Sequence, residues 1–312
     1  MSDIILHHYP SSPFSEKIRL VLGYKKMAWK SVIIPSIMPK PDVLALTGGY
    51  RKTPFMQIGS DVYCDTALIC EVLEQLQPEP TLYPKGSKGL ACITAQWADR
   101  TLFWAAMAYN LSPKGVAQLF AGVSREMTQA FGEDRRKMSA GMTRLRPGDA
   151  TAAYKSYLRH LADMLEHNEF LLGTTPTVAD FAAYHPLWFT RKQVPVMAWI
   201  LNATPGVLVW MERMAAIGHG QMEAFSATEA IALCAQSAGA QALNDASFLD
   251  GHGIALGQAV TVGAESFGSE TTAGELVAAT AERYTLRRTD ERAGVVHVHF
   301  PRVGYVLKKA PA

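Results

Sequence analysis

Four hydroxyl side chains that can donate a hydrogen bond to an anion lie close together near the start of the chain. Tyr9, Ser11, Ser12 and Ser15 belong to the run Tyr9-Pro10-Ser11-Ser12-Pro13-Phe14-Ser15. A serine hydroxyl keeps its proton at neutral pH, so it cannot act as a base, but it can donate to an anionic atom. A helix that begins near Ser15 adds free backbone N–H groups and the positive end of its dipole. These groups predict a candidate anion site at the start of this helix; which of the four hydroxyls would donate stays open, as does a plain helix-capping role for Ser12.

The apolar spacing predicts the elements that position this run. Residues 4–6 form a short apolar stretch of the strand type, and residues 15–24 carry apolar side chains at helical spacing. Further strands are predicted at 32–34, 55–58 and 62–64, with 59–61 as a hairpin turn, and a further helix at 67–76. Pro39 and Pro41 predict an irregular connection before the hairpin. The order combines one parallel crossover unit with one antiparallel hairpin.

Lys40, Thr53-Pro54 and Asp65-Thr66 follow the serine run at spacings that resemble the N-terminal domain of glutathione transferases. Ser12-Pro13-Phe14-Ser15 is similar to the CPxC turn of glutaredoxins with both sulfurs replaced by hydroxyls. In the tau and phi classes of the transferase family a serine at this place is catalytic, and in the omega class a cysteine stands there. The resemblance covers roughly residues 3–220.

The resemblance implies glutathione as co-substrate and a role for each of these residues. Ser12 would contact the sulfur, next to Phe14. Thr53 would precede a cis proline, Pro54, and pair its backbone with the cysteinyl part. Asp65 and Thr66 would hold the γ-glutamyl group in place of the family's usual Glu-Ser, and Lys40 would face the glycine carboxylate. The alternatives are a simple helix start at Asp65-Thr66 and a solvated loop charge at Lys40.

The sequence pattern changes twice in the rest of the chain. Beyond a proline-rich connection near 77–86, apolar spacing is helical to about residue 216, and after residue 251 glycines separate short β-prone runs. The predicted fold is an α/β thioredoxin-like domain (1–80), an all-α glutathione transferase domain (87–222), a linker or helix (223–250) and a small β-rich module (251–312) similar to SH3-like barrels. Thr177-Val178-Ala179-Asp180 resembles the family's N-capping box for a core helix.

The second substrate would lodge against an apolar wall. By family analogy, Phe103, Trp104, Met107 and Tyr109 of the helical domain supply this wall, with Tyr9 and Ser11 nearby. Aromatic residues at helical spacing are more often core packing, which is the alternative for all four.

Composition excludes several other classes of protein. The chain has 312 residues, a formal net charge of +2 and no long basic run, which argues against nucleic acid as a partner. No segment has the length and apolarity of a membrane span or of a secretory signal. Four cysteines without metal-ligand spacing, and His297 and His299 without a third ligand, predict no metal site and reduced thiols in a cytoplasmic protein.

These observations predict an enzyme that activates the glutathione thiolate with a serine hydroxyl for attack on a small-molecule electrophile. The family resemblance implies a homodimer. One alternative keeps the fold but binds or regulates without catalysis. A second alternative is a glutathione-dependent reductase, which the serines at positions 12 and 15 disfavour because that chemistry uses a protein thiolate.

Overall fold

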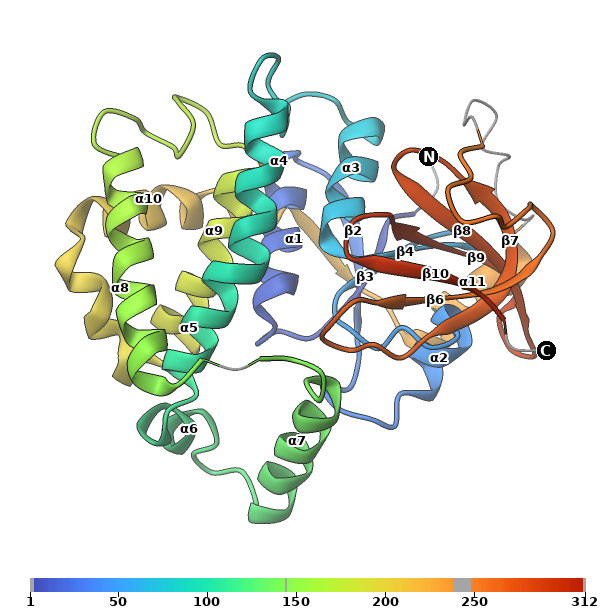
Figure 1. Ribbon diagram of the computed structural model, residues 1–312, viewed down its shortest axis with the longest axis horizontal. Helices are drawn as coiled ribbons and strands as arrows, with labels where there is room; N and C mark the ends of the chain where they lie inside the picture. The colour runs from blue at the N-terminus through green and yellow to red at the C-terminus, as the bar shows by residue number, and fades with distance from the viewer. Residues whose placement is uncertain (1–2, 144, 238–247, 311–312) are drawn as a thin grey trace.

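The computed structural model describes residues 3–143, 145–237 and 248–310. A sheet-based region formed by the start and the end of the chain stands beside a helical region formed by its middle (Figure 1). None of the described helices is both long and apolar enough to cross a membrane.

The first seven elements follow the predicted order closely. They are β1 (Ile5–His8), α1 (Pro13–Tyr24), β2 (Ala28–Ile33), α2 (Pro41–Thr47), β3 (Phe55–Ile58), β4 (Asp61–Cys64) and α3 (Thr66–Leu76). β1 pairs with β2 in parallel and with β3 antiparallel, and β3 and β4 form the predicted hairpin. The prediction of an irregular segment after Pro39 was wrong in part, because Pro41 occupies the first turn of α2, where its missing N–H costs nothing.

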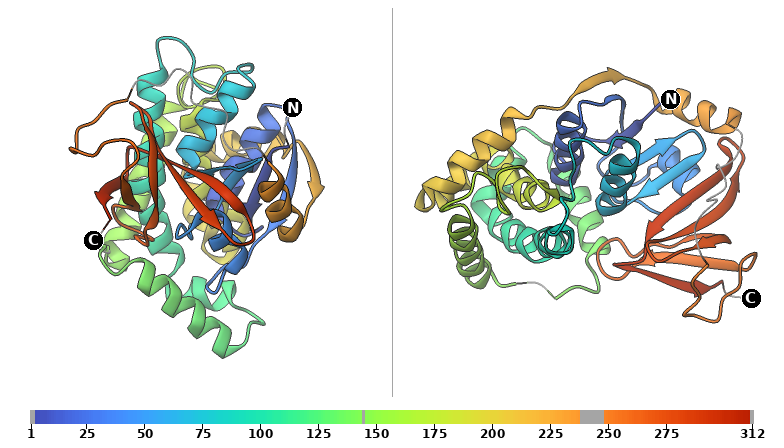
Figure 2. Two further views of the ribbon diagram at one scale, coloured as in Figure 1. Left: turned by 90° about the vertical axis from the view of Figure 1, so that its right-hand side faces the viewer. Right: turned by 90° about the horizontal axis from the view of Figure 1, so that it is seen from above.

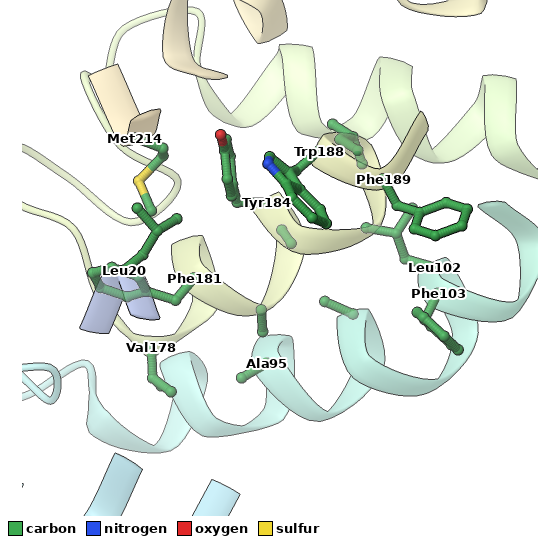
Figure 3. Packing of buried hydrophobic residues seen from close by; sticks show 14 of the residues in the cluster. Leu20, Ala95, Leu102, Phe103, Val178, Phe181, Tyr184, Trp188, Phe189 and Met214 are labelled. Atoms are coloured by element: carbon green, nitrogen blue, oxygen red, sulfur yellow. The ribbon is translucent and has the colours of Figure 1, made fainter. Parts of the chain in front are cut away.

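The middle of the chain is helical throughout, as predicted. Its elements are α4 (Lys88–Trp97), η1 (Ala98–Leu102), α5 (Phe103–Asn110), α6 (Pro113–Leu119), α7 (Arg125–Met138), α8 (Pro147–Met164), α9 (Val178–Trp188), η2 (Phe189–Gln193), η3 (Pro195–Ala203) and α10 (Pro205–Ala216). Every residue of α9 is buried, so this helix is the centre of the bundle. Leu20 of α1 joins Phe181 and Met214 in the same apolar cluster, which fastens the first helix to the bundle (Figure 3).

The last part of the chain adds strands at both edges of the N-terminal sheet. Its elements are β5 (Gln221–Ala224), α11 (Ala227–Gln236), β6 (Ala259–Ala264), β7 (Thr272–Ala279), β8 (Arg283–Asp290), β9 (Gly294–Pro301) and β10 (Tyr305–Lys309). β5 pairs with β2, and β9 pairs in parallel with β4, which gives one sheet in the order β10-β6-β7-β8-β9-β4-β3-β1-β2-β5. Part of the predicted linker, residues 238–247, lies outside the described residues.

The C-terminal strands and the N-terminal sheet also share a core. Phe55 and Val62 belong to the same buried cluster as Val298 and Phe300 of β9. His299 Nε2 donates to Asp61 Oδ1 at 2.8 Å across the β4–β9 junction. The right-hand view of Figure 2 shows the C-terminal strands beside the N-terminal sheet, which they join through the pairing of β9 with β4. An SH3-like closure is not confirmed, since the described strands pair in an open linear order; the four-part division of the chain stays a prediction.

Candidate functional site

Ser12 is the N-cap of α1 and lies in the wall of a cleft of about 1140 Å³ between the sheet and the helical region. Its Oγ accepts a hydrogen bond from the backbone N–H of Ser15 at 3.2 Å. Accepting this bond uses a lone pair, so the O–H remains free to donate to a ligand. The Ser12 side chain can therefore cap the helix and donate to an anion at the same time.

The other hydroxyls of the run differ in position. Tyr9 and Ser11 also line the cleft, and the Tyr9 hydroxyl accepts from Arg135 Nη2 at 3.4 Å. Ser15 is fully buried, stands outside the cleft wall, and its Oγ has no partner among the residues that the structure describes. Of the three serines, Ser12 combines the helix N-terminus with access to the cleft.

The Thr53–Pro54 peptide is cis, as the resemblance implied, and stands directly before β3. Thr53 lines the cleft. Within residues 3–143, 145–237 and 248–310, the Thr53 backbone N–H and C=O make no hydrogen bond. An extended peptide in the cleft can therefore pair with this backbone as an added strand does.

Asp65 and Thr66 open α3 and face the same cleft. Asp65 has a φ of 78°, and its Oδ1 accepts from the backbone N–H of Ala67 at 3.0 Å. Thr66 Oγ1 accepts from Lys17 Nζ at 3.1 Å, and Lys17 is paired with Asp99 at 2.6 Å. Asp65 therefore caps the start of α3. The adjoining Lys17 and Asp99 also line the cleft, and the sequence did not identify them as site residues.

Two lysines of the cleft wall have no carboxylate in ion-pair range among the described residues. Lys40 Nζ donates to the Arg51 backbone oxygen at 3.2 Å, so Lys40 is not a solvated loop charge. Burial, together with the charges of Arg135 and Arg51, lowers the pKa of Lys40 to about 8. Lys52, which the sequence reasoning also missed, lies over the rings of Tyr50 and Tyr305. A carboxylate is the natural complement of such cations.

The predicted apolar wall is present with one correction. Phe103, Trp104 and Met107 line the cleft, and Phe14 packs on Phe103 with ring centroids 4.7 Å apart. Tyr109 does not line it: its side chain is buried in the bundle, and its hydroxyl donates to the Met197 backbone oxygen at 2.9 Å. Tyr109 lies two positions after Met107, about 200° further round the helix, so it points away from the cleft and into the core.

The far wall of the cleft comes from the C-terminal strands, which sequence reasoning left without a role. Phe267, in the β6–β7 loop, meets Trp104 edge to face at a centroid distance of 5.0 Å. Arg302, Val303 and Gly304 of the β9–β10 turn also line the cleft. Gly304 has a φ of 90°, a backbone conformation that favours glycine at this position of the turn.

The protein's own thiols are poorly suited to act as nucleophiles. All four cysteines are free. Burial raises the pKa of Cys70 to about 12 and that of Cys234 to about 11, and it also raises the pKa of Cys92, the one cysteine that lines the cleft. A thiolate that reacts here at neutral pH is therefore better supplied by a bound molecule. Within the described residues, no three His, Cys, Asp or Glu side chains stand close enough to hold a metal ion.

A thioredoxin-like sheet followed by a helical bundle is the arrangement of glutathione-transferase-like proteins. Residues 6–81 match the model of the glutathione S-transferase N-terminal domain, and residues 95–213 match that of the C-terminal domain. The chain is 40% identical to a GST-like protein from Pseudomonas syringae, whose crystal structure superposes with a TM-score of 0.83 over 99% of this chain and 100% of that one. This chain belongs to the glutathione S-transferase family.

Two curated relatives are more distant. FtsZ-localized protein A of Caulobacter vibrioides is 24% identical over 183 residues, 57% of this chain and 73% of that protein. Pyrimidodiazepine synthase of Drosophila melanogaster is 32% identical over 77 residues, 23% of this chain and 31% of that protein. The family models end at residue 213, whereas the likeness to the Pseudomonas syringae protein includes the C-terminal strands.

Proposed function

We propose that the protein is a glutathione transferase of the serine type, in which Ser12 stabilises the thiolate of bound glutathione. The observation that carries the proposal is the position of the Ser12 hydroxyl, at the N-terminus of α1 and in the wall of a cleft. The same wall contains Lys40 and Lys52, which have no carboxylate in ion-pair range among the described residues. A free thiol has a pKa of about 8.5, and lowering it by about two units requires about 3 kcal/mol. One donated hydrogen bond and the helix N-terminus together are of this size.

The tripeptide would lie across the cleft in an extended conformation. Its cysteinyl part would pair with the free backbone of Thr53, and its γ-glutamyl group would reach Asp65 and Thr66. Its glycine carboxylate would meet the ammonium groups of Lys40 and Lys52. Each end of the ligand thereby finds a group of opposite charge.

The thiolate would attack an electrophilic carbon of a small molecule held against Phe103, Trp104 and Met107. A carbon–sulfur bond forms, and the leaving group departs with the electron pair of the bond that breaks. Phe267 would close this apolar end from the C-terminal side. The proposal includes a homodimer in the cytoplasm, as the family resemblance implies, and sedimentation analysis measures the oligomeric state.

The first test is titration calorimetry with glutathione, combined with a conjugation assay on an activated aryl halide. We expect saturable binding of one tripeptide per chain and release of halide that depends on glutathione. Absence of measurable glutathione uptake would refute the proposal.

A second candidate function is glutathione binding without catalysis. The similarity to FtsZ-localized protein A favours it, because that name describes a location at another protein and not a reaction. Tight glutathione binding without conjugation of any electrophile tested would select this candidate over the first.

Lys40 should make ligand binding depend on pH. Its pKa of about 8 means that the ammonium form prevails below that pH and is lost as the pH rises through it. If the charged form holds the glycine carboxylate, the affinity for S-methylglutathione, which has no thiol to titrate, should fall about tenfold between pH 7 and pH 9.

Lys40→Arg is the matched control, since arginine stays charged throughout this range. The variant also corrects for the α-amino group of the ligand, which titrates nearby. Calorimetry at several pH values measures both proteins, and an identical decline in the two would contradict the role of Lys40.

A further inference from the structure

Tyr305, the first residue of β10, lies against two residues of the N-terminal site although 240 positions separate it from Asp65. It is buried and stands behind the cleft wall, of which it is not a part. Its strand pairs with β6 through Ala264, and the cleft-lining turn 302–304 directly precedes it. Tyr305 thus reaches the site from the part of the chain that the family models do not cover.

The hydroxyl of Tyr305 fixes the Asp65 carboxylate. It donates to Asp65 Oδ2 at 3.0 Å, while the backbone N–H of Asp65 donates to the Tyr50 hydroxyl at 3.1 Å. Asp65 has a positive φ of 78°, a region that non-glycine residues adopt only where their surroundings hold them. Two tyrosines therefore restrain both the backbone and the side chain of this residue.

The ring of Tyr305 holds the Lys52 ammonium. Lys52 Nζ lies 4.7 Å from the Tyr305 ring centroid and 5.5 Å from that of Tyr50. Burial lowers the pKa of Lys52, and the charge of Asp65 opposes this effect. Contact with two aromatic faces stabilises a cation that has no carboxylate partner among the described residues.

We propose that Tyr305 is a positioning residue of the tripeptide site, and that the C-terminal strands complete this site. The inference rests on the proposed function, in which Asp65 accepts from the ligand's ammonium group and Lys52 donates to its carboxylate. Through its hydroxyl Tyr305 holds the acceptor for the ligand's ammonium group, and through its ring it holds a donor for the glycine carboxylate. A hydrogen bond that orients a carboxylate acts on ligand affinity and leaves the reacting sulfur untouched.

Tyr305→Phe tests the hydroxyl, because it keeps the ring that contacts Lys52. We expect the dissociation constant for S-methylglutathione to rise about tenfold, and the KM for glutathione to rise in parallel while kcat changes less than twofold. Tyr305→Leu, which removes the ring as well, should weaken binding further. Tyr284→Phe is the matched control, since Tyr284 is a buried tyrosine of the same strands whose ring contacts Arg302, in the far wall of the cleft, and neither Asp65 nor Lys52.

A double-mutant cycle separates positioning from general stability. In an Asp65→Asn background, Tyr305→Phe should cost much less affinity than in the unaltered protein, whereas a general loss of packing would cost the same in both. Thermal unfolding of each variant checks that it folds. Should Tyr305→Phe fail to fold, the Leu variant and the cycle built on it decide in its place.

The outcomes distinguish the two proposals. If the unaltered protein binds S-methylglutathione and Tyr305→Phe binds it equally well, or loses the same affinity in both backgrounds, the inference about Tyr305 is overturned and the proposed function stands. If the unaltered protein binds none, the proposed function fails, and the inference fails with it.

Discussion

Replacing Ser12 by alanine is expected to lower kcat/KM for glutathione conjugation about 100-fold. The hydroxyl is the side-chain donor that the proposal places at the sulfur, and its loss leaves the helix N-terminus alone to stabilise the thiolate. The thiol pKa of bound glutathione, followed by thiolate absorbance in a pH titration, should rise toward its free value of about 8.5. Steady-state kinetics measure the rate effect.

Ser12→Ala also removes a helix cap, which costs about 1 kcal/mol of stability, so the variant must be compared at a temperature where both proteins are folded. Ser15→Ala is the control: Ser15 is buried and stands outside the cleft wall, so its loss should leave kcat/KM within a few-fold of the unaltered protein. A large effect at Ser11 or Tyr9 combined with a small one at Ser12 would move the donor to one of those residues.

Replacing Asp180 by alanine is expected to destabilise the fold by about 4 kcal/mol. This carboxylate is fully buried and accepts four hydrogen bonds: from the backbone N–H groups of Leu171 and Thr177, from the Thr177 hydroxyl and from the Trp210 indole. Its removal leaves these buried donors without partners at the start of α9, the centre of the bundle. Urea-induced unfolding measures the loss.

Asp163→Ala on α8 is the control for the Asp180 prediction. Its carboxylate is largely exposed, so its removal should change the free energy of unfolding by less than about 0.5 kcal/mol. If Asp180→Ala lowers the free energy of unfolding by less than about 1 kcal/mol, water replaces the four hydrogen bonds. The capping carboxylate is then not needed for the stability of the fold.

Local sequence patterns predicted most of the secondary structure of the first 76 residues. The strands, the hairpin and the helix starts of this region follow from apolar spacing and from turn residues, which act over a few positions. The two strands that pattern missed, β5 and β10, are short edge strands. β5 has the sequence Gln-Met-Glu-Ala, is exposed at every position and is a strand only because it pairs with β2.

The candidate site divides in the same way. Ser12, Thr53, Asp65 and Thr66 each stand at the end of a local element, and the structure brings them to one cleft. Pro54 forms the cis peptide next to Thr53 but is not among the residues that line the cleft. Tyr109 was placed in the cleft wrongly, because helical spacing alone does not tell which face of α5 is buried. The sequence did not identify Phe267 and Arg302 as cleft residues, because the pattern of a glycine-rich segment does not predict which part of the protein its loops will contact.

By itself the sequence determined the start of α1 at Ser12, the cis proline before β3 and the capping carboxylate of α9, since each depends on residues within a few positions of one another. Only the tertiary structure decided that β9 would pair with β4 and carry Tyr305 to Asp65 and Lys52. No periodicity or local spacing in the sequence predicts contacts between residues more than 200 positions apart. They arise when two edge strands from distant parts of the chain pair and bury a common apolar core, which is a property of the folded molecule as a whole.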